Sequence, residues 1–331
     1  MFLENMGAKW HPNRNKRGRD AVAPDMKAIT YSHYGSPDVL ELTDQPRPKV
    51  APGMVLVKVK SASVNPVDWK IMTGHLDSIM DVQFPITIGW DVAGVVESQG
   101  IDAADFQPGD EVISYGRKDF LHGGSFAEYI ALPVRLLARK PKALSWEQSA
   151  GLPLTGLTAY QVLNRLGLQR GETLLIHGGS GGVGTMGIQI AVERGARVIA
   201  TASPKNHDYL RSLGAEPVSY GEGLAERVRQ LAPDGVDVVA DFVGGVLEVT
   251  LAVLRDRGRH ASIADSKAAR HGGTWMWVRP YAEDLQALAD MADAGKLTVE
   301  VAKTFPLQQA ADAVRLSMQG HTRGKIVVNV G

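Results

Sequence analysis

A glycine-rich loop between an apolar strand and a helix constrains this chain more than any other feature. The loop reads GSGGVG over residues 179–184, follows TLLIH and precedes MGIQIAVERG. In that context the glycines allow a tight turn, close approach of backbone amides to a pyrophosphate, and close helix packing. The pattern predicts a dinucleotide site at the helix N-terminus, with a ligand-free glycine turn as the alternative. The residues expected to hold the cofactor are Gly179, Gly181, Gly182, Val183 and Gly184.

Strand-like and helix-like runs alternate around this loop. Ser145 and Gln148 have the spacing of a capping box and open a long helical stretch. The runs TLLIH, ARVIATA and VDVVADF that follow are almost continuously apolar and are separated by helical segments. Such strands are typical of a parallel sheet covered by helices on both faces. We therefore expect an α/β fold with a doubly wound Rossmann sheet.

The region before this sheet has a different pattern. From Met26 to Pro141 the segments are short and β-branched, such as MVLVKVKSASV, VAGVVES and DEVISY, and Gly and Pro separate them. This pattern predicts a mostly antiparallel β domain. The C-terminal stretch returns to isolated strands and one helix. We expect it to complete the first domain, so that residues 26–149 and 297–331 form one domain and 150–296 the other.

Composition excludes several classes of protein and site. The chain has 36 basic and 36 acidic side chains, so no net charge draws it to nucleic acid or a membrane surface. It has no cysteine, which excludes disulfides, iron–sulfur clusters, thiolate-bound zinc and a cysteine nucleophile. No apolar run approaches the roughly 18 residues of a membrane span, and the N-terminus lacks a secretory h-region. We expect a cytoplasmic protein.

Residues 1–25 form a separate N-terminal segment. They contain five basic side chains and little apolar periodicity, and the pattern changes abruptly at Met26. We expect this extension to be disordered, as termini commonly are. Two interpretations are open. The segment is a basic arm that binds nucleic acid or an acidic partner, or it results from a start codon placed upstream.

The end of the second strand predicts which dinucleotide binds. NAD sites carry an acidic residue about 20 residues after the glycine loop, whereas a 2′-phosphate requires cations instead. Residues 199–206 read IATASPKN and contain no acid. Ser203 can donate a hydrogen bond and Lys205 a positive charge, with Arg211 further along. NADP(H) is favoured, and solvated surface positions are the alternative for Lys205 and Arg211.

Several motifs together resemble one family. They are LIHGGSGGVG, GLTAY, ATASPKNHDYLRSLGA, VNPVDWK, FPITIGWDVAGVV, PGDEV, FAEY and HTRGKIVV. The chain from Met26 to Gly331 resembles the zinc-independent branch of the medium-chain dehydrogenase/reductases, the quinone oxidoreductase and zeta-crystallin group. The catalytic-domain motifs look closest to members that reduce alkenals and enones. The resemblance implies a GroES-like catalytic domain beside the Rossmann domain.

The resemblance also implies a set of cofactor contacts. Ser203, Lys205 and Asn206 are expected around the 2′-phosphate, and Tyr220 near the adenosine. The residues expected to border the nicotinamide or face the cofactor are Thr158, Val243, Ile263 and Gly324. Core packing at strand ends is the alternative for Val243 and Ile263.

The positions that hold zinc in zinc-dependent relatives are altered. The cysteine position falls near Asn65, and Trp90 stands where those relatives have a histidine. No metal site is therefore expected, and alcohol oxidation, which needs a Lewis acid, is disfavoured.

Hydride transfer to an electron-poor carbon needs only donors or a cation near the carbonyl oxygen. By family position Lys70 supplies the cation and Asn65 an amide donor. The alternative for Lys70 is a surface lysine, and the alternative for Asn65 is a turn residue before Pro66. Tyr115 is a candidate proton donor, with a buried structural tyrosine as the alternative.

These observations predict an NADPH-dependent, zinc-independent reductase of quinones or α,β-unsaturated carbonyls. A reductase dedicated to one biosynthetic pathway and a non-catalytic NADPH-binding protein, structural or RNA-binding, are the alternatives. Zero net charge and the retained Asn65 and Lys70 weigh against the last.

The apolar run within residues 274–279 predicts assembly. Trp275 and Trp277 occupy what should be the edge strand of the sheet, and a bare edge promotes pairing. We expect a homodimer through this segment; the alternative is that one of these tryptophans lines the substrate cleft.

Overall fold

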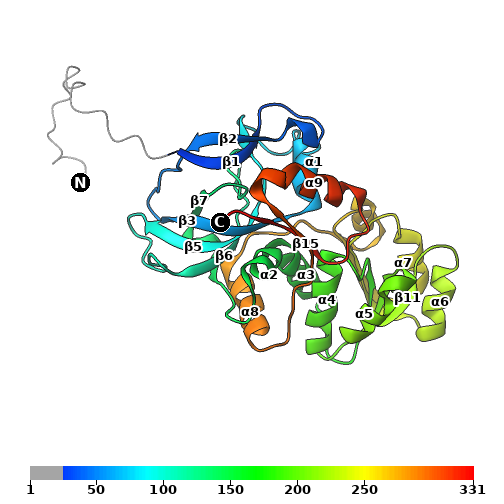
Figure 1. Ribbon diagram of the computed structural model, residues 1–331. Helices are drawn as coiled ribbons and strands as arrows, with labels where there is room; N and C mark the ends of the chain where they lie inside the picture. The colour runs from blue at the N-terminus through cyan, green and yellow to red at the C-terminus, as the bar shows by residue number, and fades with distance from the viewer. Residues whose placement is uncertain (1–24) are drawn as a thin grey trace, which may run out of the picture.

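The computed structural model describes residues 25–331 as two sheet-based regions (Figure 1). The β-rich region holds the N-terminal strands, and the α/β region holds helices arranged around a parallel sheet. The C-terminal segment, red in Figure 1, runs back to the β-rich region. The expected N-terminal extension, residues 1–25, lies outside the described residues except for Asp25.

The β-rich region is built on two sheets. The smaller has the antiparallel order β2 (Glu41–Pro46), β1 (Asp25–Tyr31), β4 (Ile86–Thr87). The larger has the order β15 (Val301–Pro306), β16 (Lys325–Asn329), β3 (Met54–Val64), β5 (Asp91–Gln99), β6 (Glu111–Tyr115), β8 (Leu137–Arg139), and β7 (Tyr129–Pro133) also pairs with β3. All its pairings are antiparallel except that of β15 with β16. The C-terminal strands thus join the sheet of the first region.

The α/β region contains a six-stranded parallel sheet. Its spatial order is β11 (Glu216–Ser219), β10 (Arg197–Ala202), β9 (Thr173–His177), β12 (Val236–Asp241), β13 (Leu254–Ser262), β14 (Thr274–Trp275). All its pairings are parallel. This is the Rossmann order, and it confirms the predicted fold class. The edge strand β14 is only two residues long, so the expected strand beyond Trp275 continues as irregular chain.

Helices cover both faces of the parallel sheet. They are α3 (Pro153–Arg165), α4 (Gly182–Glu193), α5 (His207–Ser212), α6 (Leu224–Leu231) and α7 (Leu247–Val253). Two further helices contact the β-rich region: α2 (Trp146–Gly151) packs on β3, β5 and β16, and α8 (Ala282–Asp293) lies against β8 and α3. Along β9, Leu174 and Ile176 share a core cluster with α3 and α4, whereas Leu175 packs with Leu224 and Val228 of α6. Adjacent residues thus face opposite layers, and each buried aliphatic side chain contributes roughly 1.5–3 kcal/mol. This two-sided burial explains the continuous apolar strands.

Local sequence signals explain where several helices begin. Ser145 accepts a hydrogen bond from the Gln148 amide, and the Gln148 side chain accepts one from the Ser145 amide. The predicted capping box is confirmed. In the β-rich region, α1 (Pro66–Met72) starts after Asn65 with Pro66 in its first turn, and α9 (Ala310–Gln319) precedes β16.

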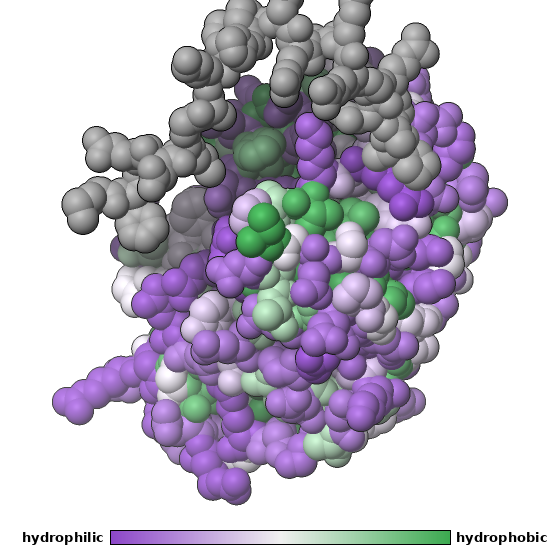
Figure 2. Space-filling model, turned by 90° about the vertical axis from the view of Figure 1, so that its left-hand side faces the viewer, coloured by the Kyte–Doolittle hydropathy of each residue, from purple (hydrophilic) through white to green (hydrophobic). Residues whose placement is uncertain are grey.

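The surface seen from the β-rich side is mostly hydrophilic, and hydrophobic residues gather in a small group near its middle (Figure 2). Within residues 25–331, no helix has the length and apolarity needed to cross a membrane.

Candidate active site in the interdomain cleft

A cavity of about 690 Å³ lies between the two regions. One wall is the glycine loop with the carboxyl ends of β9, β10 and β12. The opposite wall is the junction of β3 with α1, and the chain entering β16 closes one side. A crevice at the carboxyl ends of parallel strands is the usual ligand site of a doubly wound sheet.

The glycine loop has the geometry that its sequence predicts. α4 begins at Gly182, and a Cβ on Gly184 would lie 2.1 Å from the Gly178 oxygen, so a side chain there is excluded. A Cβ on Gly179 would lie 2.8 Å from that of Ala200. At Gly181 the nearest atom would be 3.5 Å away, so this position is open toward the cavity. The exposed helix N-terminus and this cradle fit a pyrophosphate.

Of the loop residues expected to bind the cofactor, four line the cavity: Gly181, Gly182, Val183 and Gly184. Gly179 packs behind them against Ala200, and the left-handed turn residue is Gly178, with a φ of +81°. Gly324 also lines the cavity, and its amide donates to the Ser180 oxygen at 3.2 Å. Its φ of +77° and the Glu300 oxygen, 2.3 Å from a Cβ built there, both favour glycine.

The residues expected around the 2′-phosphate follow β10, and Tyr220, expected near the adenosine, follows β11. Tyr220 lines the cavity and is half exposed. Asn206 donates to the Ser203 hydroxyl at 3.4 Å, and the exposed Lys205 follows Ser203 by two residues. Lys205 and Asn206 line an adjoining open groove that shares His321 with the cavity. Lys205 and Asn206 therefore lie beside the cavity, whereas Tyr220 lies on its wall.

The residues expected at the nicotinamide separate into two groups. Val243 is exposed and lines the cavity. Thr158 is buried outside its lining and donates to the Leu154 oxygen at 2.6 Å. Ile263 is half-buried against the core, also outside the lining. Thr155, nearly one helical turn before Thr158, occupies the cavity wall instead.

His177, at the end of β9, is a cavity residue that sequence reasoning missed. It is 1% exposed, its Nε2 lies 3.3 Å from the Thr250 hydroxyl, and its Nδ1 has no protein partner. Burial lowers the pKa of His177 to about 4, against the opposing effect of Asp241. The imidazole is therefore neutral near pH 7, and its free Nδ1 can accept or donate one hydrogen bond, depending on the tautomer.

A buried polar cluster occupies the opposite wall. Lys325 donates to the Val64 carbonyl at 3.1 Å and to the Asn65 amide oxygen at 2.5 Å. The Asn65 amide nitrogen donates to Asp91 at 2.9 Å, and the Asp91 carboxylate also accepts from the Ser63 hydroxyl and the Leu154 amide. Burial raises the pKa of Asp91 and lowers the pKa of Lys325, and each charge opposes the shift of the other.

The other two expected catalytic residues do not reach the cavity. Lys70 is exposed on α1, with its Nζ 5.7 Å from the centroid of the Trp69 ring. Tyr115 is 1% exposed and packs edge-on against Trp90 at a centroid distance of 5.8 Å; burial raises its pKa. Of the three candidates, the structure places Asn65 alone at the cleft. Lys325, which sequence reasoning missed, is the cation beside it.

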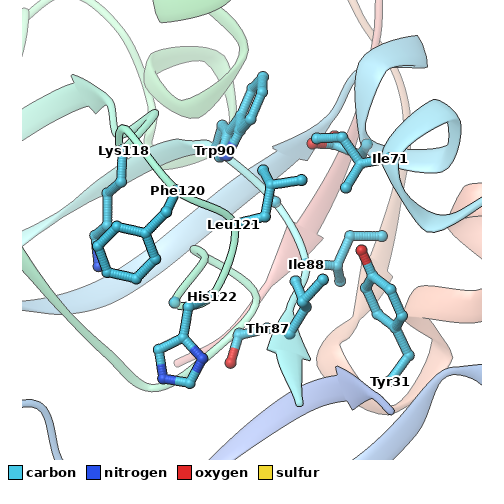
Figure 3. A pocket seen from close by; sticks show the side chains of 13 residues that line it. Tyr31, Ile71, Thr87, Ile88, Trp90, Lys118, Phe120, Leu121 and His122 are labelled. Atoms are coloured by element: carbon cyan, nitrogen blue, oxygen red, sulfur yellow. The ribbon is translucent and has the colours of Figure 1, made fainter. Parts of the chain in front are cut away.

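A second, much smaller pocket of about 10 Å³ lies within the β-rich region. In Figure 3, Tyr31 and Ile71 lie on the side opposite Lys118 and His122. The Tyr31 hydroxyl and one oxygen of Asp68, which also lines this pocket, are buried without a protein partner. The space and the two polar atoms suit about one water molecule.

The cluster does not fit a zinc ion. Over residues 25–331 no group of three or more His, Asp or Glu side chains could hold a metal. Asn65 bonds to Lys325 and Asp91, and Trp90 packs on Tyr115. The Lys325 ammonium occupies this wall with a positive charge, which would repel a bound cation.

Comparisons with known proteins agree with this architecture. The alcohol dehydrogenase GroES-like domain profile matches residues 51–142, and the zinc-binding dehydrogenase profile matches residues 213–328. The NADPH-dependent alkenal/one oxidoreductase of Arabidopsis thaliana is 37% identical over 93% of this chain and 81% of its own length. This chain belongs to the medium-chain dehydrogenase/reductase family.

Other family members extend the comparison. The 2-methylene-furan-3-one reductase of Solanum lycopersicum is 34% identical over 93% of this chain and 80% of its own length. The solved structure of the quinone oxidoreductase from Coxiella burnetii is 33% identical, covers 93% of this chain and all of its own, and has a TM-score of 0.80. The predicted family is thus confirmed.

Proposed function

We propose that this protein is an NADPH-dependent reductase of quinones or α,β-unsaturated carbonyl compounds. The observation that carries the proposal is one cavity of about 690 Å³ with a dinucleotide loop on one wall and a buried polar cluster on the other. Relatives named as alkenal/one, furanone and quinone reductases support the same reaction class.

The chain supplies binding groups along the whole cleft. The amides at the start of α4 and the open face of Gly181 hold the pyrophosphate. Ser203, Lys205 and Asn206 receive the 2′-phosphate, and Tyr220 packs near the adenosine. Val243 and Gly324 border the rest of the cofactor. When bound, NADPH supplies a hydride to the electron-poor carbon of the substrate.

The polar cluster serves the substrate oxygen. Reduction moves negative charge onto this oxygen, which donors and a cation stabilise most strongly where water is excluded. Asn65 lines the cavity and keeps one amide hydrogen beyond the one it gives to Asp91. Because these groups replace a Lewis acid, the reaction is zinc-independent in this proposal.

The proposal includes a homodimer in the cytoplasm. Trp275 and Trp277 are 54% and 40% exposed, while Met276 and Val278 pack against the core. Trp275 lies on the two-residue edge strand β14 and Trp277 on the irregular chain that follows it, and an edge with exposed aromatic side chains is suited to contact with a second copy. The absence of cysteine suits a reducing compartment.

The test is an absorbance assay of NADPH with a panel of quinones, enones and simple aldehydes. Rapid NADPH consumption with quinones or enones is expected. Binding of NADPH without turnover of any acceptor would favour the non-catalytic alternative.

A further inference from the structure

The whole side chain of Lys325 lies at the junction of the β-rich and α/β regions. It is 3% exposed, and its stem passes close to Gly151 and Gly182: a Cβ built on either glycine would lie 3.1 Å or less from it. The next residue toward the N-terminus, Gly324, bonds to the glycine loop. Lys325 therefore reaches the cavity wall at the junction of β3 with α1, from a strand whose preceding residue is bonded to the glycine loop.

The ammonium group has one hydrogen left for a ligand. Its three hydrogens can serve three acceptors, and Val64 and Asn65 take two of them. Asp91 lies 3.8 Å from Nζ, beyond hydrogen-bond length. Among the described residues that line the cavity, Lys325 is the only Lys, Arg, Asp or Glu.

We propose that Lys325 is the catalytic acid of the reduction and donates a proton to the carbonyl oxygen as the hydride arrives. This inference rests on the proposed function. The hydride that NADPH would supply forms a C–H bond at the β-carbon, and NADPH is oxidised to NADP+ as its own C–H bond breaks. The former C=C pair forms the new double bond to the carbonyl carbon, the carbonyl π pair moves to the oxygen, and the N–H bond of Lys325 breaks as the O–H bond forms. An enol and a neutral amine result; the enol then tautomerises to the saturated ketone, and solvent reprotonates the amine. A quinone gives a hydroquinone in the same way.

The surroundings make Lys325 a better acid than an exposed lysine. Burial lowers its pKa, and the buried carboxyls of Asp91 and Asp68 oppose that effect, so the ammonium persists but loses its proton more easily. Asp91 is a positioning residue because it holds the Asn65 amide, and the oxygen of Asn65 in turn holds Nζ. His177 is neutral and lies on the opposite wall of the cavity, which leaves Lys325 as the acid beside Asn65.

The test compares Lys325→Met with Lys70→Met, an exposed lysine on α1 as the matched control. Single-turnover rates are measured with an enone and with an electron-poor quinone, together with the NADPH dissociation constant. Lys325→Met should slow enone reduction roughly 10²–10⁴-fold and quinone reduction about tenfold or less, because the enolate is the more basic oxyanion. NADPH binding should change about threefold at most, and Lys70→Met should behave as wild type.

The outcomes separate this inference from the proposed function. Wild-type protein that oxidises no NADPH with any enone or quinone overturns both. The acid role alone is overturned if the wild type is active but Lys325→Met loses the same rate factor with both substrates. It is also overturned if Lys325→Met loses turnover only in proportion to its loss of NADPH binding. Enone reduction by wild type that is no slower in deuterated water also contradicts it. If Lys325→Met does not fold, Lys325→Met combined with Asp91→Asn replaces it, because this pair leaves no unpaired buried charge.

Discussion

The ammonium of Lys325 donates a hydrogen bond to the amide oxygen of Asn65, which lies 260 residues earlier in the chain. The bond joins the start of β16 to the start of α1 and places a cation on the cavity wall opposite the glycine loop. Because Gly324 bonds to the glycine loop, the same strand also contacts the cofactor wall. The register of one C-terminal strand therefore connects the two halves of the site.

The glycine loop predicts a contrast between two alanine variants. At Gly181 a Cβ meets no atom closer than 3.5 Å, so Gly181→Ala should fold normally but weaken NADPH binding about tenfold or more, or about 1.4 kcal/mol. At Gly184 the Cβ would lie 2.1 Å from a carbonyl oxygen, so Gly184→Ala should lower the melting temperature. Fluorescence titration and thermal unfolding measure the two effects. Unchanged NADPH binding by Gly181→Ala would contradict the assigned loop.

Cofactor selectivity should depend on Lys205. Its charge is expected to meet only the 2′-phosphate, so Lys205→Ala should weaken NADPH about tenfold and leave NADH nearly unchanged. Lys58→Ala, an exposed lysine on β3, is the control. Titration of the unmodified protein with both nucleotides is informative as well: tighter binding of NADH than NADPH would show that the end of β10 has been misinterpreted.

The parts of the fold that sequence predicted depend on local signals. The glycine loop, the capping box at Ser145 and the continuous apolar strands each result from interactions among residues near in the chain or from two-sided burial. The polar cluster depends instead on contacts between β3, β5 and β16, which no local pattern reports. Lys325 therefore remained an ordinary strand residue in the sequence.

Helix position alone does not explain why Lys70 stays outside the cavity lining. Lys70 lies one turn after Pro66, which lines the cavity, but its side chain is exposed at the end of the short helix α1. Thr158 shares a helix face with Thr155 but lies one turn deeper, outside the cavity lining. Motif position identified the right elements in both cases, and only packing showed which residue reaches the cleft.

Asp68 predicts a pH dependence of stability. Burial raises its pKa from 3.8 to about 7, so the folded state binds the extra proton between these values and loses stability as pH rises through them. Asp68→Asn removes this cost. Its free energy of unfolding relative to wild type should therefore increase by about 2–3 kcal/mol as the pH rises from 5 to 8. Urea unfolding at both pH values measures it, with the exposed Asp256→Asn as control. A difference that does not grow with pH would contradict the assignment.

The exposed tryptophans predict the oligomeric state. Light scattering at micromolar concentration should give a dimer mass, and Trp275→Lys with Trp277→Lys should give a monomer because the aromatic edge is removed. Leu42→Lys, an equally exposed apolar position on β2, should remain dimeric. A monomeric, fully active wild-type protein would count against pairing through residues 274–279.

Transfer of isotopic label tests the central claim most directly. Protein dialysed against a chelator is mixed with an enone and with NADPH that carries deuterium at the transferred position, and the product is analysed by mass spectrometry and NMR. We predict undiminished turnover and one deuterium on the β-carbon of each product molecule. Product without carbon-bound deuterium, or turnover that stops after dialysis and returns with zinc, would contradict zinc-independent hydride transfer by this cleft.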